Sequence, residues 1–306
     1  MRSLKNIRFR VSRKLSHFLL YHYFKGAKYL RNKLCRWLVP AAEGPIICST
    51  IFDVDMLVDP VLDKGLERSI YYFGEYEAGT LSVLRNFLHK GDVFLDVGAN
   101  IGFLSCVVAR FVGNGGWVYA VEPHPEIYRI LKENIRINKL KNVRCLNIAL
   151  GAKVSHARIY DNPSVNRGSA SLIRPQGVIE ESGKEVKVTA IDTLLENKQL
   201  RTPTLIKIDV EGFELEVLKG AKTLLEGSQA PMLCVEYSNL HPQSKGSTLD
   251  IHRFIKSVNN YSVYKLQHGK GIPSKLIKIS EEHELPYHDN IFCFLDKHLN
   301  KLKRSE

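Results

Sequence analysis

Residues 91–122 read GDVFLDVGANIGFLSCVVARFVGNGGWVYAVE, and this stretch determines the expected fold. An apolar run at 93–97 leads into a glycine turn at 98–102, an apolar helical segment at 103–112 and a second apolar run at 117–121. This order predicts a strand, a tight turn, a helix and a second strand parallel to the first in a buried sheet. Glu122 follows the second strand, where a nucleotide-binding βαβ unit holds the ribose of its ligand. The stretch therefore predicts an α/β fold with a site for an adenosine cofactor.

The glycine turn indicates which adenosine cofactor is expected. A dinucleotide site needs the pattern GxGxxG, because the middle glycine makes room for a pyrophosphate. Here Asn100 takes the middle position, and the glycines are Gly98 and Gly102. Asp96 precedes the turn, and a carboxylate suits the sulfonium and ammonium groups of S-adenosylmethionine, which carries no phosphate. The turn favours S-adenosylmethionine over NAD; a plain strand-to-helix connection is the alternative.

Several separate segments resemble the FkbM-type S-adenosylmethionine-dependent methyltransferases. They are DVGANIG at 96–102, IKIDVEGFE at 206–214 with VLKGA at 217–221, GEYE at 74–77, NRGSASL at 166–172 and VTAIDTL at 188–194. The resemblance covers about half of the chain. It implies a class I methyltransferase fold, whose Rossmann-like sheet is mostly parallel with an antiparallel closing strand. It also implies O-methylation of a hydroxyl on a sugar, a glycan, a polyketide or another small natural product.

Candidate cofactor residues follow from the turn, the strand ends and this resemblance. Ala149 ends the third predicted strand, where an adenine ring would lie in such a fold. Tyr76 and Glu77 match the GEYE segment, and they either contact the cofactor or serve only in capping and packing. The full set is Tyr76, Glu77, Asp96, Gly98, Ala99, Asn100, Gly102, Glu122, Pro123, Ala149 and Asp209.

Three acidic residues are the catalytic candidates. Asp209 and Glu211 follow the fourth predicted strand, and Glu236 follows the fifth, so all three belong near the ligand crevice. A hydroxyl nucleophile has to lose a proton, and two nearby acids raise the pKa of one of them toward that of a useful base. Asp209 is a candidate for base or for anchor of the methionine end, and Glu211 for a substrate contact. The same oxygens also suit Mg²⁺, and Glu236 alternatively pairs with Lys207 or another base.

The remaining chain divides into three parts by composition and pattern. Residues 1–42 are a basic amphipathic helical arm, and residues 43–90 hold a small β-hairpin and a helix at 75–88. Residues 91–306 form the methyltransferase domain, with a β-insertion at 151–188. Within it we expect strands at 143–148, 204–208 and 232–235, helices at 126–138, 213–225 and 251–259, and an antiparallel pair at 261–266 and 291–295, with a loop at 267–290 over the pocket.

The arm carries an unusual share of the charge. Residues 1–42 contain eleven lysines or arginines and no acidic residue, and the whole chain has a net charge of +12. Aromatic and aliphatic residues alternate with these basic ones, which is typical of a helix on an anionic membrane face. The alternatives are packing on the body or on another subunit, and contact with nucleic acid.

Other readings of the whole chain are weaker. Nucleic-acid methyltransferases of this fold show an [N/D/S]PP[Y/F] block or a Pro-Cys pair, and neither occurs here. A non-catalytic, membrane-associated binding protein with a methyltransferase fold is a second alternative. In the methyltransferase reading, Arg167 of the NRGSASL segment is a candidate contact for an acidic acceptor. No apolar run spans a bilayer, a signal peptide is not expected, and the six scattered cysteines favour a reduced cytoplasmic setting, with peripheral membrane contact through the arm as one reading.

Overall fold

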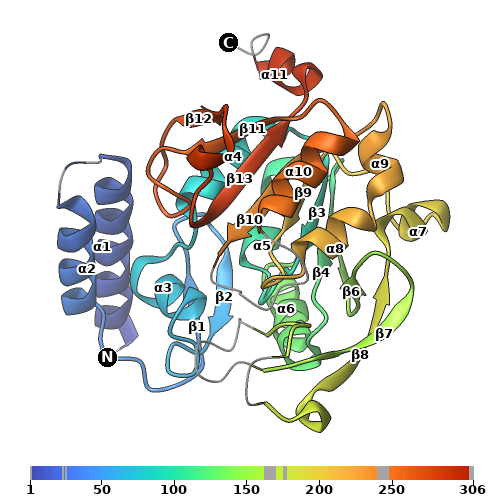
Figure 1. Ribbon diagram of the computed structural model, residues 1–306. Coiled ribbons are helices and arrows are strands. Elements are labelled where there is room, and N and C mark those ends of the chain that lie inside the picture. The colour runs from blue at the N-terminus through green and yellow to red at the C-terminus, as the bar shows by residue number, and fades with distance from the viewer. Residues whose placement is uncertain are drawn as a thin grey trace.

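The computed structural model describes residues 2–22, 24, 26–161, 170–174, 178–239 and 248–302. Its main sheet contains β3 (Val93–Val97), β4 (Trp117–Val121), β5 (Val143–Leu146), β9 (Leu205–Ile208), β10 (Met232–Ser238), β11 (Ser262–Leu266), β12 (Leu276–Ile279) and β13 (His288–Phe294). The spatial order is β12-β11-β13-β10-β9-β3-β4-β5 (Figure 1). Strands β5, β4, β3, β9 and β10 are parallel, and β13 pairs antiparallel with both β10 and β11. The predicted Rossmann-like sheet with its antiparallel closing strand is confirmed.

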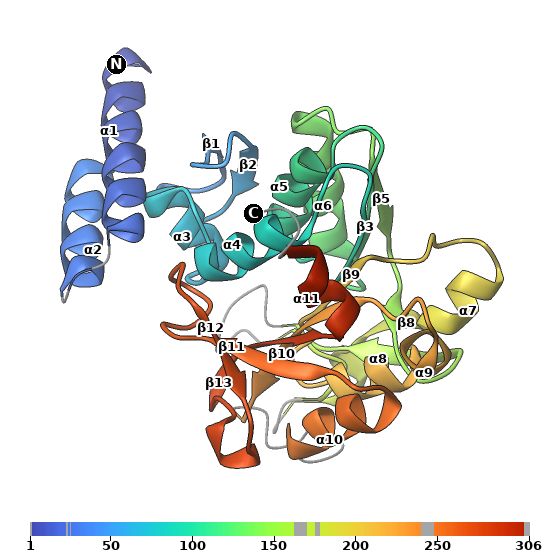
Figure 2. The same ribbon diagram turned by 90° about the horizontal axis from the view of Figure 1, so that it is seen from above.

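Helices cover both faces of this sheet, as Figure 2 shows. One face carries α4 (Ala78–Phe87), α5 (Phe103–Val112) and α6 (Pro125–Ile137); the other carries α7 (Ile191–Glu196), α8 (Glu214–Lys219), α9 (Lys222–Glu226) and α10 (Thr248–Val258), and α11 (Asp296–Leu302) follows β13. Side chains alternate along each strand, so Phe94 enters one core and its neighbour Leu95 enters the other. The central strands are therefore buried on both faces, which explains their continuous apolar runs.

Two smaller β-structures flank the main sheet. An antiparallel hairpin joins β1 (Ile46–Ser49) to β2 (Asp55–Val58), as the sequence predicts. A three-stranded sheet contains β6 (Ala149–Leu150), β8 (Lys184–Thr189) and β7 (Ser155–Ile159), in that order. It lies within the expected β-insertion, of which residues 162–169 and 175–177 are outside the described part.

The basic arm forms a helical hairpin of α1 (Arg2–Tyr21) and α2 (Ala27–Leu38). It packs on α3 (Leu66–Phe73), at one edge of the molecule (Figure 1). Two arm arginines are buried in this contact. The Arg13 guanidinium donates to the carbonyl oxygens of Ile70 and Tyr71 at 3.0 and 2.8 Å, and Arg31 Nη1 lies 2.8 Å from Glu75 Oε1. Charged groups, as well as apolar packing, thus attach the arm to the body.

Several predicted elements differ in their limits. The helix expected at 75–88 starts at Ala78, because Glu77 has left-handed backbone angles of φ 47° and ψ 46°. The single helix expected at 213–225 is two short helices, α8 and α9, separated at Gly220. The segment expected as a loop at 267–290 contains β12 and a 3₁₀ turn at Glu282–Glu284. Helices α3, α7 and α11 are not among the expected elements.

Gly220 provides a test of this packing. A Cβ added there would lie 2.0 Å from the carbonyl oxygen of Gly151, which is backbone and cannot move freely. Gly220→Ala should lower the free energy of unfolding by about 1–3 kcal/mol because it overpacks this contact. Gly271→Ala is the matched control, since a Cβ there meets nothing within 4 Å. Urea denaturation measures both, and equal stability of the two variants would contradict the prediction.

Candidate active site

A cavity lies at the carboxyl ends of β3, β4 and β9, where parallel α/β sheets bind ligands. It encloses about 1040 Å³, its open mouth included. Its walls come from the glycine turn after β3, from the ends of β4 and β6, and from residues 209–211 after β9. The cavity therefore gathers segments that lie more than a hundred residues apart in the sequence.

The glycine turn fits closely against the end of β9. Gly98 has φ +81°, and a Cβ there would lie 1.8 Å from the carbonyl oxygen of Asp209. Gly102 has φ +85°, and a Cβ there would meet a methyl carbon of Leu131 at 2.4 Å. Only glycine combines such angles with such close neighbours. The two glycines therefore fix the turn between the sheet and α6.

Glu122 is held in place by two backbone donors. The N–H of Asn100 donates to Oε2 and the N–H of His124 donates to Oε1, both at 2.9 Å. The side chain is buried, and this burial raises the pKa of Glu122 to about 7 although both N–H groups oppose the shift. A carboxylate fixed at the cavity wall is an acceptor ready for ligand hydroxyl groups.

The charge of the cavity wall suits a cationic ligand. Four acidic residues line it, namely Asp63, Glu122, Asp209 and Glu211, and Lys207 is the basic residue among its lining residues. An excess of carboxylates attracts a sulfonium and an ammonium group, and it repels a pyrophosphate. The residues present therefore fit S-adenosylmethionine better than a dinucleotide.

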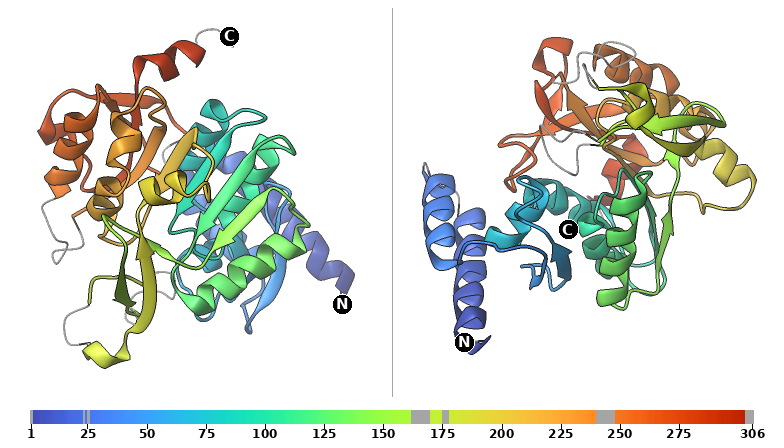
Figure 3. Two further views of the ribbon diagram at one scale, coloured as in Figure 1. Left: turned by 90° about the vertical axis from the view of Figure 1, so that its right-hand side faces the viewer. Right: turned by 90° about the horizontal axis from the view of Figure 1, so that it is seen from below.

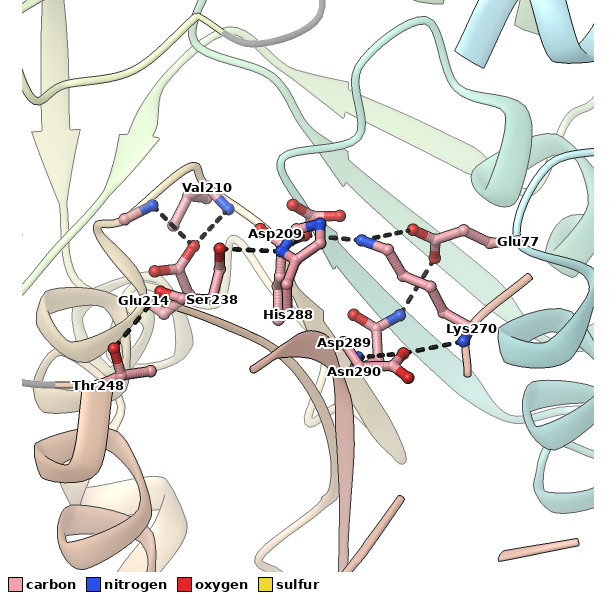
Figure 4. Close-up of polar contacts among 12 residues, drawn as sticks. Glu77, Asp209, Val210, Glu214, Ser238, Thr248, Lys270, His288, Asp289 and Asn290 are labelled. Carbon is pink, nitrogen blue, oxygen red and sulfur yellow. Dashed lines mark hydrogen bonds and ion pairs between the residues drawn. The ribbon is translucent and has the colours of Figure 1, made fainter. Parts of the chain in front are cut away.

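The turn after β9 is also tightly held. Glu211 has φ 55°, and Gly212 follows it with φ 100°. The carboxylate of Glu214, at the start of α8, accepts from the N–H groups of Val210 and Gly212 at 3.0 and 3.1 Å. This local capping fixes the segment that carries Asp209 and Glu211 (Figure 4).

A cluster of buried and half-buried charges adjoins the cavity, and Figure 4 shows its members Glu77, Asp209 and Lys270. Lys207 Nζ lies 2.8 Å from Asp209 Oδ2, while Lys270 Nζ lies 2.7 Å from Glu236 Oε1 and 3.2 Å from Glu77 Oε1. Asn290 Nδ2 donates to Glu77 Oε2 at 3.1 Å. We call Glu77, Lys207, Asp209, Glu236 and Lys270 the charge cluster.

The members of the charge cluster differ in how readily they take up a proton. Burial disfavours the charge of Asp209, but Lys207 and Lys270 outweigh burial and hold the pKa of Asp209 well below its ordinary range. Burial, and then the negative charge of Asp209, raise the pKa of Glu236 well above its ordinary value. Glu236 therefore takes up a proton first as the pH falls, and Asp209 stays ionised.

The structure brings most of the predicted cofactor and catalytic residues together. Those lining the cavity are Tyr76, Gly98, Ala99, Asn100, Glu122, Pro123, Ala149, Asp209 and Glu211. Glu77 and Glu236 lie in the adjoining charge cluster. Gly102 ends the glycine turn and lies against Leu131 of α6. Asp96 is buried within β3, where Oδ2 accepts from the Ser105 hydroxyl at 2.6 Å, and it is not among the lining residues. Arg167 lies outside the described residues.

Sequence reasoning missed Lys270 and Asn290. Lys270 lies between β11 and β12, about sixty residues after Asp209, and nothing in its neighbourhood marks it. Asn290 offers a signal, because it is a fully buried amide that directly precedes the apolar run 291–294 of β13. A buried amide needs hydrogen-bond partners, and this requirement points toward a polar cluster.

The charge cluster does not fit a Mg²⁺ site. Within the residues that the structure describes, no group of three or more potential histidine, cysteine or acidic ligands comes together in a metal-binding arrangement. Lys207 and Lys270 already contact the carboxylates of Asp209, Glu236 and Glu77, the oxygens that a magnesium ion would require.

Comparison with known proteins adds a family match. The sequence model of the methyltransferase FkbM domain matches residues 96–263, which is more than half of the chain. This range includes the glycine turn, Glu122 and Asp209, together with Glu236, and it ends in β11.

Curated relatives match shorter parts of the chain. Hexuronic acid methyltransferase AglP of Haloferax volcanii is 29% identical over 150 residues, which cover 49% of this chain and 58% of the relative. A probable cobalt-precorrin-6B C(15)-methyltransferase (decarboxylating) of Sulfolobus acidocaldarius is 27% identical over 150 residues, covering 48% of this chain and 78% of the relative. A crystal structure of methyltransferase FkbM from Methylobacillus flagellatus superposes with a TM-score of 0.44 at 19% identity, over 67% of this chain and 43% of that one.

Removal of the positive charge of Lys270 tests whether this side chain stabilises the carboxyl groups of Glu77 and Glu236. Lys270→Met leaves Glu77 and Glu236 buried without their cation, and we expect it to lower the free energy of unfolding by about 3 kcal/mol. Carboxyl groups with a raised folded-state pKa keep their protons to higher pH than in the unfolded chain, so the folded state loses stability as the pH rises. The loss should therefore be larger at neutral pH than at acid pH.

Chemical denaturation at the two pH values measures this loss. Lys278→Met is the matched control, because Lys278 is exposed on the adjoining strand β12. A Lys270→Met variant whose stability and pH dependence equal those of the control would contradict the arrangement of the charge cluster.

Proposed function

This chain belongs to the methyltransferase FkbM family, and we propose that it transfers the methyl group of S-adenosylmethionine to a hydroxyl of a sugar, a glycan or another small natural product. The observation that carries the proposal is the acid-lined cavity at the carboxyl ends of β3, β4 and β9, with the ionised Asp209 in its wall. The match to AglP covers 58% of the length of that relative, which is less than two thirds. The activity of the whole protein is therefore proposed and does not follow from the match alone.

Each end of the cofactor has suitable partners in the cavity wall. Glu122 would accept hydrogen bonds from the ribose hydroxyls, because two backbone donors already orient its carboxylate. Ala149 and Leu150 offer an apolar and backbone surface for the adenine ring. Asp209 and the glycine turn would face the methionine end. When bound, S-adenosylmethionine supplies a methyl group activated by a positively charged sulfur.

Asp209 is the proposed proton acceptor. It lines the cavity and stays ionised, because Lys207 and Lys270 hold its pKa well below its ordinary range. Such a carboxylate is a weak base toward a neutral alcohol. However, the hydroxyl proton becomes strongly acidic as the oxygen forms its new bond to carbon, so a weak base is sufficient late in the reaction. Glu211 lies at the same wall and is the proposed contact for the acceptor.

Support for a sugar acceptor comes from a relative. AglP is named for hexuronic acid, whereas the Sulfolobus relative is named for a precorrin, so the relatives differ in what they methylate. A carbohydrate hydroxyl remains the first acceptor to test. The alternatives are a nucleic-acid methyltransferase and a non-catalytic binding protein with the same fold.

A labelled-methyl assay tests the proposal directly. The full chain is incubated with methyl-labelled S-adenosylmethionine and, in separate reactions, with hexuronic acids, neutral glycans, small hydroxylated natural products and RNA. Label recovered as a methyl ether on a hydroxyl supports the proposal. Label on a nucleic-acid base, or tight cofactor binding without transfer to any acceptor, would support one of the two alternatives.

Glu122→Ala should weaken the binding of S-adenosylmethionine by about 1–3 kcal/mol, through the loss of hydrogen bonds to ribose. Since the pKa of Glu122 is raised to about 7, the affinity of the unaltered protein should fall as the pH falls below that value, and the variant should lose this dependence. Isothermal titration calorimetry measures both effects. Glu133→Ala, at a half-exposed position on α6 where the carboxylate pairs with Arg136, is the control, and equal affinities of the two variants would remove Glu122 from the site.

Asp209→Asn should reduce methyl transfer by about 10²- to 10⁴-fold, because the amide cannot accept the hydroxyl proton. Asp53→Asn is the matched control: Asp53 is exposed with φ 58°, and asparagine tolerates such backbone angles. The rate is measured with saturating cofactor after circular dichroism has confirmed folding. Near-normal turnover of Asp209→Asn would exclude Asp209 as the base.

A further inference from the structure

The helical hairpin exposes large apolar side chains on the sides that face away from the body. On α1 these are Ile7, Val11 and Phe18, which lie along one stripe of the helix at spacings of four and seven residues. On α2 they include Tyr29 and Trp37, whose exposed fractions are 70% and 79%. Residues of this size and exposure on a single helical hairpin indicate an interaction surface.

The basic residues of the hairpin divide into two groups. Arg13 and Arg31 are buried and hold the hairpin to the body. The others whose side chains are described are exposed, and they are Arg8, Arg10, Lys14, Lys28, Lys33 and Arg36. Of these, Lys28 lines a cavity on the inner side of the hairpin and Arg36 lies over the ring of Tyr72 in α3, so neither is counted in the outer face. Lys14 lies between Val11 and Phe18 on the apolar stripe of α1, and no acidic residue occurs anywhere in residues 1–42. The exposed surface is therefore both apolar and strongly positive.

We propose that this outer face of the α1–α2 hairpin binds the surface of an anionic lipid membrane. Charge complementarity selects the partner: lipid headgroups with negative charge attract the lysines and arginines, while aromatic and aliphatic side chains insert at the headgroup boundary. Tryptophan and tyrosine are enriched at that depth, which suits Tyr29 and Trp37. No helix within the described part of the chain is long and apolar enough to cross a bilayer, so the contact is peripheral.

The position of the hairpin agrees with this use. Figure 2 and Figure 3 show α1 and α2 side by side at one edge of the molecule, outside α3 and away from the main sheet. A membrane can therefore reach the outer face without displacing the core. The inner side of the hairpin also lines a second cavity, in which Leu20 and Lys28 lie with Tyr76 and Lys270, so the docked hairpin lies close to the charge cluster.

Vesicle sedimentation of the full chain tests the proposal. Vesicles of phosphatidylcholine alone are compared with vesicles that also contain phosphatidylserine, at low and high salt. We expect binding to the phosphatidylserine vesicles that weakens at high salt, and much weaker binding to phosphatidylcholine alone. Equal binding to both vesicles, or no binding to either, overturns the proposal.

Charge-reversal variants locate the surface. Arg10→Glu/Lys14→Glu/Lys33→Glu alters the outer face and leaves Arg13 and Arg31 intact, so the hairpin should stay docked. Each basic residue contributes roughly fivefold to partitioning, so the loss of three positive charges alone should weaken binding about one hundredfold, and the three added negative charges should weaken it further. Lys153→Glu/Lys187→Glu/Lys278→Glu is the control, with the same change of net charge at exposed positions of the body. Equal losses in the two triple variants would show nonspecific attraction and overturn the proposal.

The double variant Phe18→Ala/Trp37→Ala distinguishes membrane binding from self-association and from RNA binding. This variant keeps every charge, and we expect it to weaken vesicle binding while sedimentation velocity shows the same oligomeric state as the unaltered chain. If the unaltered chain instead self-associates through this face, or binds RNA but not vesicles, the membrane proposal is wrong. Thermal unfolding of each variant confirms that the hairpin remains folded.

Discussion

The interior of the molecule must accommodate the carboxyl groups of Glu77, Asp209 and Glu236, of which Glu77 and Glu236 are buried, Asp209 is half-buried, and Glu236 has a raised pKa. An unpaired buried charge costs several kcal/mol, whereas a paired and hydrogen-bonded one is tolerated. Two lysines meet this requirement from different places: Lys207 extends from β9 itself, and Lys270 reaches in from the segment between β11 and β12. The closing part of the sheet is thereby joined to α4 and to the carboxyl ends of the parallel strands, so the cavity cannot form independently of the last third of the chain.

Asp209 belongs both to this charge cluster and to the cavity wall. Its carboxylate contacts Lys207, while its carbonyl oxygen lies against Gly98 in the turn after β3. Because Glu236 and Asp209 interact electrostatically, a change in the protonation of Glu236 alters the electrostatic potential at the cavity wall, where Asp209 lies. The same five residues thus contribute to stability and to the electrostatics of the proposed reaction, and an account of either one has to include the other.

The sequence predicts what depends on neighbouring residues. The apolar runs and glycines of residues 91–122 specify strand, turn and helix locally, and β3, α5 and β4 follow them. It fails where a distant group decides the structure. Helices α8 and α9 are divided at Gly220, which lies against the carbonyl oxygen of Gly151. Helix α4 starts after Glu77, whose backbone is left-handed and whose carboxylate contacts Lys270 and Asn290. Lys270 was missed for the same reason, since its partners Glu77 and Glu236 lie just before α4 and in β10. The resemblance supplied the expectation of a mostly parallel sheet with an antiparallel closing strand, which periodicity alone does not contain.

Three consecutive residues of the GEYE segment connect the parts of the molecule. Glu75 pairs with Arg31 of the hairpin, Tyr76 lines the cavity, and Glu77 joins the charge cluster. All three lie in the short connection between α3 and α4, whose backbone is fixed by Gly74 at φ 74° and by Glu77 at φ 47°. The ion pair that attaches the hairpin therefore lies one residue from a side chain of the cavity wall and two residues from a member of the charge cluster. The arm and the site, although separate in composition and charge, meet in this short connection.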